Sequence, residues 1–274
     1  MYMAVCGICG SEVSADKIVT HFPQRKEQYY LCPACRSFFL YPLPHHEENV
    51  KFMGDDVVDR MELSDRKRTL YFHKRLSLIE QYVPATSTQR LCFKIGCGTG
   101  LFLQQARRNN WQVAGIELSS KLAARARLNN PDTLIIEGDF LIAELPVGKL
   151  YNAVIALDVL EHVLSPRRML ERIHGMLCPG GVVLIQTPNA GSFRALLQRG
   201  RWIMFEPDYH FHLFSARALG MLLEKTGFEL VMSRTVSGSG QEQGIRCLFA
   251  SIKEGILNSL KLGNALLVIA RRIS

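Results

Sequence analysis

Short apolar runs alternate with helical stretches from residue 91 to the end of the chain. The runs that we expect to form strands are Leu91–Ile95, Gln112–Ile116, Thr133–Glu137, Ala153–Leu157, Val182–Thr187, Phe228–Val236 and Ala265–Ala270. Helices are expected over Leu101–Asn109, Lys121–Asn129 and Pro166–Leu177, and a further one over residues 243–262. Strands that alternate with helices of this length form βαβ units, which bury a parallel sheet between two helical layers. The pattern therefore predicts an α/β fold.

Length and composition predict one large domain with a small appendage. The chain has 274 residues, of which 47% are hydrophobic and 21% are charged, so it contains enough apolar material for a sizeable core. We predict a small cysteine-rich module at residues 1–45 and a charged helical cap or linker at 46–90. The α/β domain follows at 91–274.

The cellular compartment is predicted from what the sequence lacks and from its cysteines. No run approaches the roughly 20 apolar residues that span a bilayer, and Met1–Cys6 lacks the character of a signal peptide. Reduced thiols suit the cytoplasm, where we place the protein. Four scattered cysteines are interpreted as small buried residues: Cys92, Cys97, Cys178 and Cys247.

Two C-x-x-C pairs stand near the N-terminus. They are Cys6–Cys9 and Cys32–Cys35. Each pair can present two sulfur atoms from a tight turn, and two such turns supply the four thiolates that structural zinc prefers. A redox dithiol would explain one pair but not both. We therefore predict a structural zinc ion bound by Cys6, Cys9, Cys32 and Cys35, in a zinc-ribbon-like module.

Three polar or glycine-rich features follow three successive predicted strands. A G-x-G-x-G loop with Gly96, Gly98 and Gly100 follows the first, Glu117 ends the second, and Asp139-Phe140 follows the third. Such a loop lets a ligand approach the backbone, and an acid about 20 residues later can bind ribose hydroxyls. An acid beside an aromatic ring can bind an adenine. The spacing differs from the G-x-G-x-x-G of dinucleotide sites, so we predict a nucleoside site with an amino-acid tail.

These motifs resemble those of the class I methyltransferases, which use S-adenosylmethionine. The matching segments are Ile95–Gly100, Gly115–Glu117, Glu137–Phe140, Asp158–Val163, Pro179–Gly181, Thr187–Asn189, Tyr209–Ser215 and Thr226–Phe228. The resemblance implies a seven-stranded, mostly parallel Rossmann-like sheet with helices on both faces.

The resemblance also implies a role for each cofactor-binding residue. Gly96, Gly98 and Gly100 would hold the methionine moiety of S-adenosylmethionine, and Glu117 would hold its ribose. Asp139 and Phe140 would contact the adenine. Leu157 and Asp158 would line the other side of the cofactor.

One position departs from the family pattern. The family has an acid two residues before the first glycine, where this chain has Lys94. An inward-facing lysine would repel the cofactor's ammonium group, so we expect Lys94 to point away.

Histidines are the candidates for proton removal from the acceptor, because imidazole titrates near neutral pH. We predict catalytic roles for His210, His162 and Glu161, and His212 is a further candidate base. An alternative comes from resemblance to ubiquinone-biosynthesis and small-RNA methyltransferases. There a similar acid-x-x-Glu-His set with a later histidine binds a divalent metal. In a third interpretation, Glu161 and His162 only cap the following helix.

The methyl acceptor is predicted only as a class. A net charge of +8 attracts phosphates, nucleic acid or an anionic membrane surface, but it also favours solubility. We favour a small molecule, a sugar or a glycan or lipid precursor. RNA is the alternative, and a non-catalytic binding protein is a third hypothesis. The nearest approach to a nucleic-acid stripe is Arg194, Arg199, Arg201 and Trp202.

Overall fold

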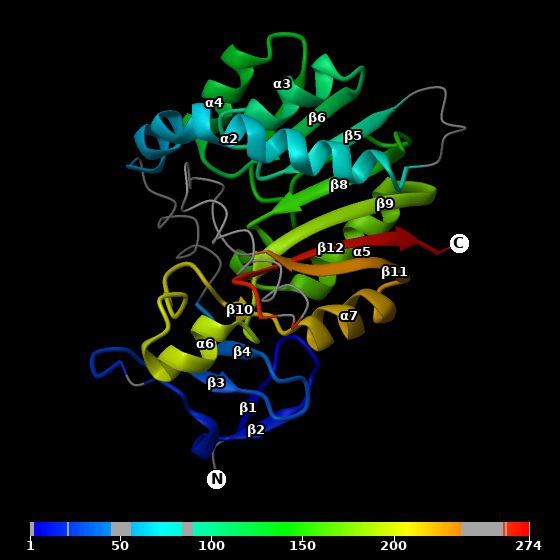
Figure 1. Cartoon of the computed structure of the whole chain (residues 1–274). Coiled ribbons are helices and arrows are strands. Elements are labelled where there is room, and N and C mark those ends of the chain that lie inside the picture. Colours follow the sequence, from blue (N-terminus) through cyan, green and yellow to red (C-terminus); the bar gives the residue numbers. More distant parts are fainter. Residues whose placement is uncertain are drawn as a thin grey trace.

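The computed structural model describes residues 3–20, 22–44, 56–83, 90–236, 260 and 262–273. Seven strands of this part form one twisted sheet (Figure 1). They are β5 (Leu91–Ile95), β6 (Gln112–Glu117), β7 (Leu134–Glu137), β8 (Tyr151–Leu157), β9 (Leu177–Pro188), β11 (Phe228–Val236) and β12 (Ala265–Arg272). The order across the sheet is β11-β12-β9-β8-β5-β6-β7.

The predicted α/β sheet is confirmed, with strand ends close to the expected ones except that β9 begins at Leu177 and not at Val182. Strands β5 to β9 pair in parallel, whereas β12 runs antiparallel to both β9 and β11. After β5 the chain builds β6 and β7 on one side and then returns to place β8 on the other. The strand order therefore reverses between β5 and β8, and ligands of open α/β sheets bind beyond the carboxyl ends of strands at such a point.

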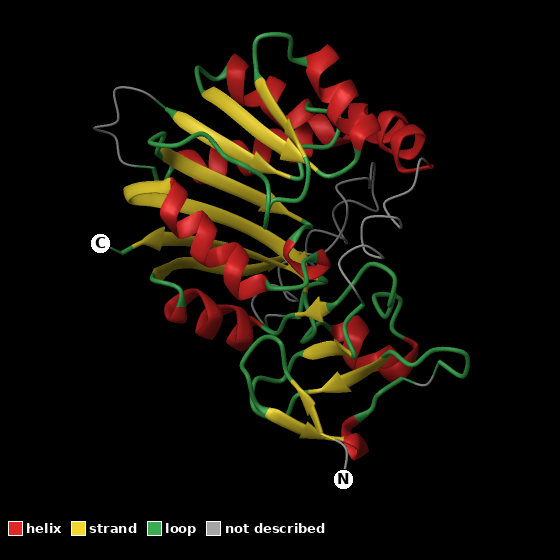
Figure 2. Ribbon diagram, turned by 180° about the vertical axis from the view of Figure 1, so that it is seen from behind, coloured by secondary structure: helices red, strands yellow, loops and turns green. Residues whose placement is uncertain are grey.

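Helices cover both faces of the sheet (Figure 2). One layer contains α2 (Asp56–Glu80), α3 (Leu101–Arg108) and α4 (Ser120–Asn129), and the other contains α5 (Pro166–Met176) and α7 (Ala216–Lys225). Successive side chains of the central strands enter opposite layers. In β5, for example, Cys92 packs with the α2 layer and Phe93 packs with the α5 layer.

Helix α2 lies in the segment predicted as a helical cap and buries one face. Phe72, Leu76 and Ile79 are buried at the i, i+4, i+7 spacing of one helix face. Leu70 is 59% exposed. It lies two residues before Phe72, which turns it away from the buried face.

The N-terminal residues form two hairpins, each with one C-x-x-C pair in its turn. The first joins β1 (Met3–Val5) to β2 (Glu12–Ser14), and the second joins β3 (Gln28–Leu31) to β4 (Phe38–Tyr41). A 3-10 turn, η1 (Ala15–Lys17), follows β2. Strand β4 also pairs with β10 (His212–Leu213), so the second hairpin continues into the chain that follows β9.

Several short elements between β9 and α7 were not predicted. They are α6 (Phe193–Gln198), the 3-10 turn η3 (Arg199–Arg201) and β10, and a 3-10 turn η2 (Leu160–His162) follows β8. The helix expected over residues 243–262 and Cys247 lie outside the described residues, apart from residues 260 and 262. Within the described ranges, no helix combines the length and apolar content needed to cross a bilayer.

Candidate active site

A cavity of about 290 Å³ opens at the reversal point of the sheet. The loops that leave β5, β6, β7 and β8 form its walls, and helix α2 contributes Arg68 and Phe72. Seven of the eight predicted cofactor residues line it: Gly96, Gly98, Glu117, Asp139, Phe140, Leu157 and Asp158. The three strand-end features identified in the sequence therefore meet around one cavity.

The glycine loop has two functions in the structure. Gly96 and Gly98 have positive φ angles of 61° and 57° and line the cavity, where a Cβ on Gly96 would come within 2.9 Å of Val159. Gly100 does not line the cavity. A Cβ there would lie 2.2 Å from Nδ2 of Asn130, so Gly100 allows helix α4 to approach the start of α3.

Glu117 is held by the loop that it faces. Its Oε2 accepts a hydrogen bond from the Gly98 amide at 2.7 Å, and its Oε1 accepts one from the Ser119 amide at 3.1 Å. The side chain is 6% exposed and lines the cavity. Each carboxylate oxygen has a further lone pair, so the group can also accept hydrogen bonds from two neighbouring hydroxyls of a ligand.

Asp139 and Phe140 follow β7 and also line the cavity. Oδ1 of Asp139 accepts a hydrogen bond from the Leu141 amide at 2.7 Å. The guanidinium of Arg172 lies 5.4 Å from the centre of the Phe140 ring, and this cation–π contact holds the buried ring in place.

Asp158 connects the cavity to helix α2. Its carboxylate accepts hydrogen bonds from Nε2 of Gln186 at 3.1 and 3.2 Å, and Oε1 of Gln186 accepts two from Arg75 of α2. Solvent reaches Asp158 through the cavity, but the surrounding protein still desolvates the carboxylate and raises its pKa. The Gln186 hydrogen bond and the charge of Lys94 act in the other direction and lower this pKa by less. The residue has a φ of 54°, which a non-glycine residue seldom adopts.

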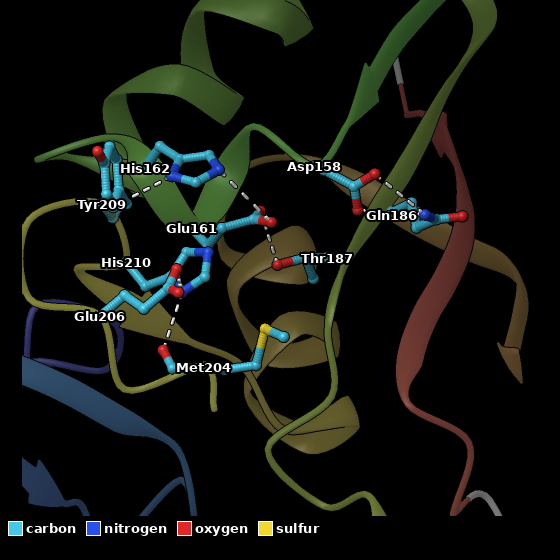
Figure 3. Close-up of polar contacts among 9 residues, drawn as sticks. All are labelled: Asp158, Glu161, His162, Gln186, Thr187, Met204, Glu206, Tyr209 and His210. Carbon is cyan, nitrogen blue, oxygen red and sulfur yellow. Dashed lines mark hydrogen bonds and ion pairs between the residues drawn. The ribbon is translucent and has the colours of Figure 1, made fainter. Parts of the chain in front are cut away.

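Glu161, His162 and His210 come together beside the cavity, with possible ligand atoms within 4.8 Å of one another (Figure 3). Nδ1 of His162 lies 2.7 Å from the Tyr209 carbonyl oxygen, and Nδ1 of His210 lies 2.8 Å from that of Met204. A carbonyl only accepts, so both Nδ1 atoms carry the proton. Both Nε2 atoms therefore keep a lone pair.

Burial determines the charges in this cluster. Desolvation lowers the pKa of His162 and that of His210, and the neighbouring His162 lowers the latter further. Desolvation raises the pKa of Glu161 well above its usual range, and the charge of Asp158 adds to this. Oε2 of Glu161 accepts a hydrogen bond from Thr187 at 2.9 Å. His162 lines the cavity, whereas Glu161 and His210 do not.

The comparisons with known proteins agree with this geometry. The sequence pattern of a family described as "Methyltransferase domain" matches residues 70–233. The chain belongs to the class I S-adenosylmethionine-dependent methyltransferase family. A crystal structure of an S-adenosylmethionine-dependent methyltransferase from Mesorhizobium loti has the same fold. Its TM-score is 0.55 at 21% identity, and the match covers 72% of this chain and 96% of that one.

The curated relatives match this chain over part of their length. A "Probable S-adenosylmethionine-dependent methyltransferase" of Mycolicibacterium smegmatis is 30% identical over 165 residues, which are 58% of this chain and 60% of the relative. A "Ubiquinone biosynthesis O-methyltransferase" of Xylella fastidiosa is 30% identical over 122 residues, 42% of this chain and 48% of the relative. The chain thus spans about half to three fifths of the length of these two relatives.

The expectation that Lys94 points away from the cavity is wrong. Lys94 is 2% exposed and lines the cavity, and its Nζ donates hydrogen bonds to the carbonyl oxygens of Ile95 and Gly96 at 2.7 and 2.8 Å. Strand alternation puts it on the same face as Cys92, under helix α2. Burial lowers its pKa to about 8, although Cys97 and Glu117 oppose this.

Two cavity residues on α2 were missed by sequence reasoning. Arg68 and Phe72 stand four residues apart, and the Arg68 guanidinium lies 4.9 Å from the centre of the Phe72 ring. The i, i+4 spacing of a basic and an aromatic residue was visible in the sequence. Nothing in the sequence indicated which strand end this helix would cover.

His212, the further candidate base, lies away from the cavity. It is fully buried, and burial lowers its pKa to about 4. A Cβ on Gly7 of the first C-x-x-C turn would lie 2.6 Å from its ring. His212 therefore packs the cysteine module against the large domain.

The four predicted zinc ligands meet in the module. The sulfur atoms of Cys6 and Cys35 are 3.8 Å apart, those of Cys9 and Cys32 are 3.6 Å apart, and all four lie within 4.8 Å of one another. Zinc–sulfur bonds of about 2.3 Å in a tetrahedron put neighbouring sulfurs about 3.8 Å apart. The hydrogen bond from Cys6 is the chief cause that lowers the pKa of Cys35 to about 5.

Proposed function

We propose that this chain transfers a methyl group from S-adenosylmethionine to a small molecule, a sugar or a glycan or lipid precursor. The main support for the proposal is that one cavity is lined by Gly96–Gly98, Glu117 and Asp139. The curated relatives support a small acceptor, since one of them is named for ubiquinone biosynthesis.

The residues present fit this cofactor. Glycine at position 96 leaves space that a Cβ would fill, and Glu117 stands where it can hold ribose hydroxyls. Asp139 and Phe140 are in place for an adenine. When bound, S-adenosylmethionine supplies a methyl group on a positively charged sulfur, and the protein has to orient the acceptor and take its proton.

We assign proton removal to His162. It lines the cavity, and its Nδ1–H is fixed by the Tyr209 carbonyl, which leaves the Nε2 lone pair as a base. The buried Glu161 has its Oε1 3.9 Å from that Nε2, and the His210 ring centre lies 5.0 Å from that of His162. The Tyr209 carbonyl thus orients His162, and an ionised Glu161 at this distance stabilises its protonated form.

The assignment can be tested with methyl-tritiated S-adenosylmethionine. The protein and a cell extract are incubated together, and the label is measured in small-molecule, lipid and RNA fractions. We expect label in the small-molecule or lipid fraction, and His162→Ala should lower it by about 10²–10⁴-fold. His73→Ala, an exposed change on α2, should leave it unchanged. Label confined to RNA, or equal rates in both variants, would contradict the proposal.

A second candidate mechanism uses Glu161, His162 and His210 as ligands of a divalent cation. The favouring observation is that both Nε2 lone pairs face the same space as the buried carboxylate while both Nδ1–H groups bind carbonyls. Metal-bound histidines commonly have this second hydrogen bond, and a metal would lower the pKa of an acceptor hydroxyl. Turnover lost on chelation and restored by Mg²⁺ or Zn²⁺ would select this mechanism over His162 alone.

We also propose that the four cysteines hold a structural zinc ion. Their sulfur separations fit a tetrahedral ion, and four sulfur ligands leave no open position for catalysis. Reduced thiols of this kind support a cytoplasmic location. In this proposal residues 1–45 form the zinc module, 46–90 the helical cap and 91–274 the methyltransferase domain.

A further inference from the structure

The segment from α6 to Ile203 exposes an unusual set of apolar and basic side chains. Phe193 is 50% exposed, Leu196 60%, Leu197 70% and Ile203 62%. Three exposed arginines lie among them, Arg194, Arg199 and Arg201. We call these seven side chains the α6 patch. Contiguous exposed apolar side chains with a basic rim are typical of an interaction surface.

Helix geometry places the apolar residues of α6 on one side. Successive residues turn by about 100°, so Phe193, Leu196 and Leu197 occupy an arc of about 100°. Ala195 lies on the opposite side and is 4% exposed. The outward stripe is therefore apolar although it faces solvent.

The patch is held firmly from behind. Ala195, Trp202 and Phe205 belong to a buried cluster with Tyr29 and Leu40 of the zinc module. The Ser192 hydroxyl accepts a hydrogen bond from the Ala195 amide and caps α6. The exposed apolar side chains are thus not available to complete this core, because other residues already fill it.

The charge of the segment has a single sign. No acidic residue occurs between Ser192 and Phe205. None of the three arginines forms an ion pair with another described residue. The next acids are Glu206 and Asp208, and Asp208 is paired with Arg25. The patch thus combines three unpaired arginines with three branched aliphatic side chains and a phenylalanine. This combination suits the boundary between anionic headgroups and acyl chains.

We propose that the α6 patch binds the surface of an anionic lipid bilayer. Its apolar side chains enter the boundary between headgroups and acyl chains, and its arginines bind lipid phosphates. Single-stranded RNA fits less well, because base stacking needs exposed aromatic faces, and the patch has one such ring, Phe193, beside three aliphatic side chains. Trp202, the residue suited to that role, is 4% exposed and packs against Phe205 at a ring distance of 5.6 Å.

The patch is followed in the chain by a residue that contacts the histidine cluster. The carbonyl of Met204, directly after Ile203, accepts the Nδ1–H bond of His210. A bilayer at the patch would lie beside the histidine loop. We therefore infer that the methyl acceptor is carried by a lipid. This inference rests on the proposed methyl transfer, whereas the proposed lipid binding is independent of it.

Vesicle co-sedimentation of the full chain tests the proposal. The vesicles contain phosphatidylcholine alone or with about one third phosphatidylglycerol, and the binding is measured at low and at physiological salt. We expect binding only to the anionic vesicles. The double variants Leu196→Ser/Leu197→Ser and Arg199→Gln/Arg201→Gln should each weaken it by about tenfold or more. The matched control is Arg108→Gln/Leu128→Ser on α3 and α4, where both residues are exposed, and it should bind like the wild type.

Other outcomes identify other occupants and would overturn the proposal. These are tighter binding of an RNA oligonucleotide than of anionic vesicles, a dimer in solution that Leu197→Ser dissociates, or equal vesicle binding by all variants. Titration of each variant with S-adenosylmethionine is measured in parallel. Lost vesicle binding with unchanged cofactor binding shows a folded chain, so failure here is distinguishable from failure of the proposed methyl transfer.

Discussion

The hydroxyl of Tyr29 donates a hydrogen bond to the carbonyl oxygen of His210. Tyr29 is fully buried and lies in the cysteine module, 181 residues before the histidine. Nearby, both Arg25 guanidinium nitrogens bind the Asp208 carboxylate at 2.7 Å, and the Ser215 hydroxyl donates to the Cys35 carbonyl. The module therefore supports the loop that carries His210.

Tyr29→Phe should loosen this loop. The change leaves a buried carbonyl without its donor, so we expect a loss of about 1–2 kcal/mol in the free energy of unfolding. The NMR signals of the His210 and His162 rings should shift. Tyr30→Phe is the matched control, since Tyr30 packs in the other core cluster, and it should leave the histidine signals in place. Unchanged histidine signals in Tyr29→Phe would show that the module does not position them.

Cofactor affinity should depend on the charge of Lys94. The pKa of Lys94 is lowered to about 8, so the side chain is cationic below that pH and neutral above it. The cation would repel the ammonium group of S-adenosylmethionine, and the affinity should rise from pH 7 to pH 9. The charged or titratable groups facing Lys94 are Cys97, Glu117, Arg68 and Asp158.

Calorimetric titration at pH 7, 8 and 9 measures this dependence. Lys94→Met keeps the length of the side chain and removes the charge, so its affinity should be higher at pH 7 and flatter with pH. Lys149→Met, at an exposed position, should behave like the wild type. The same pH slope in Lys94→Met would assign the dependence to another group.

Gly100→Ala should destabilise the fold more than Gly10→Ala, although both glycines have a positive φ. The new Cβ would meet Asn130 at 2.2 Å and the Ala126 backbone at 3.3 Å, and we expect a loss of about 2–4 kcal/mol in unfolding free energy. Gly10 has a nearly equal φ of 83° against 84°, but a Cβ there meets nothing within 4 Å. Gly10→Ala should therefore cost only about 1 kcal/mol from backbone strain. Equal losses in denaturant titrations would refute the packing role of Gly100.

Zinc removal should affect the whole chain, because β4 of the module pairs with β10 of the large domain. We expect one zinc ion per chain by elemental analysis. Cys9→Ser should lose it and lower Tm by about 10 °C or more. Cys178→Ser, outside the module, should keep both metal and Tm. If the wild type kept the same Tm after its metal was removed, zinc would have no structural role.

The sheet could be predicted from the sequence because its strands are buried on both faces and appear as continuous apolar runs. For the same reason the side of the sheet on which Lys94 lies could not be predicted. Neither face of β5 is polar, and alternation alone does not say which face borders the cavity. The meeting of Glu117 and Asp139 followed from the rule that parallel strands end at one edge.

Contacts between distant segments could not be predicted in this way. Residues that meet across 181 positions, such as Tyr29 and His210, leave no local pattern. Strand β10 has only two residues and owes its conformation to β4. The exposed face of α6 follows from the cluster behind it, because six residues are too few for a periodic signal.

The central claim is that Glu117 and the glycine loop hold an adenosyl group. Calorimetric titration with S-adenosylmethionine tests it most directly, using the wild type, Glu117→Gln and the exposed control Glu144→Gln. We expect one site per chain, affinity weakened by about 10²-fold in Glu117→Gln and unchanged in Glu144→Gln. No heat of binding in the wild type, or the same affinity in Glu117→Gln, would contradict the account.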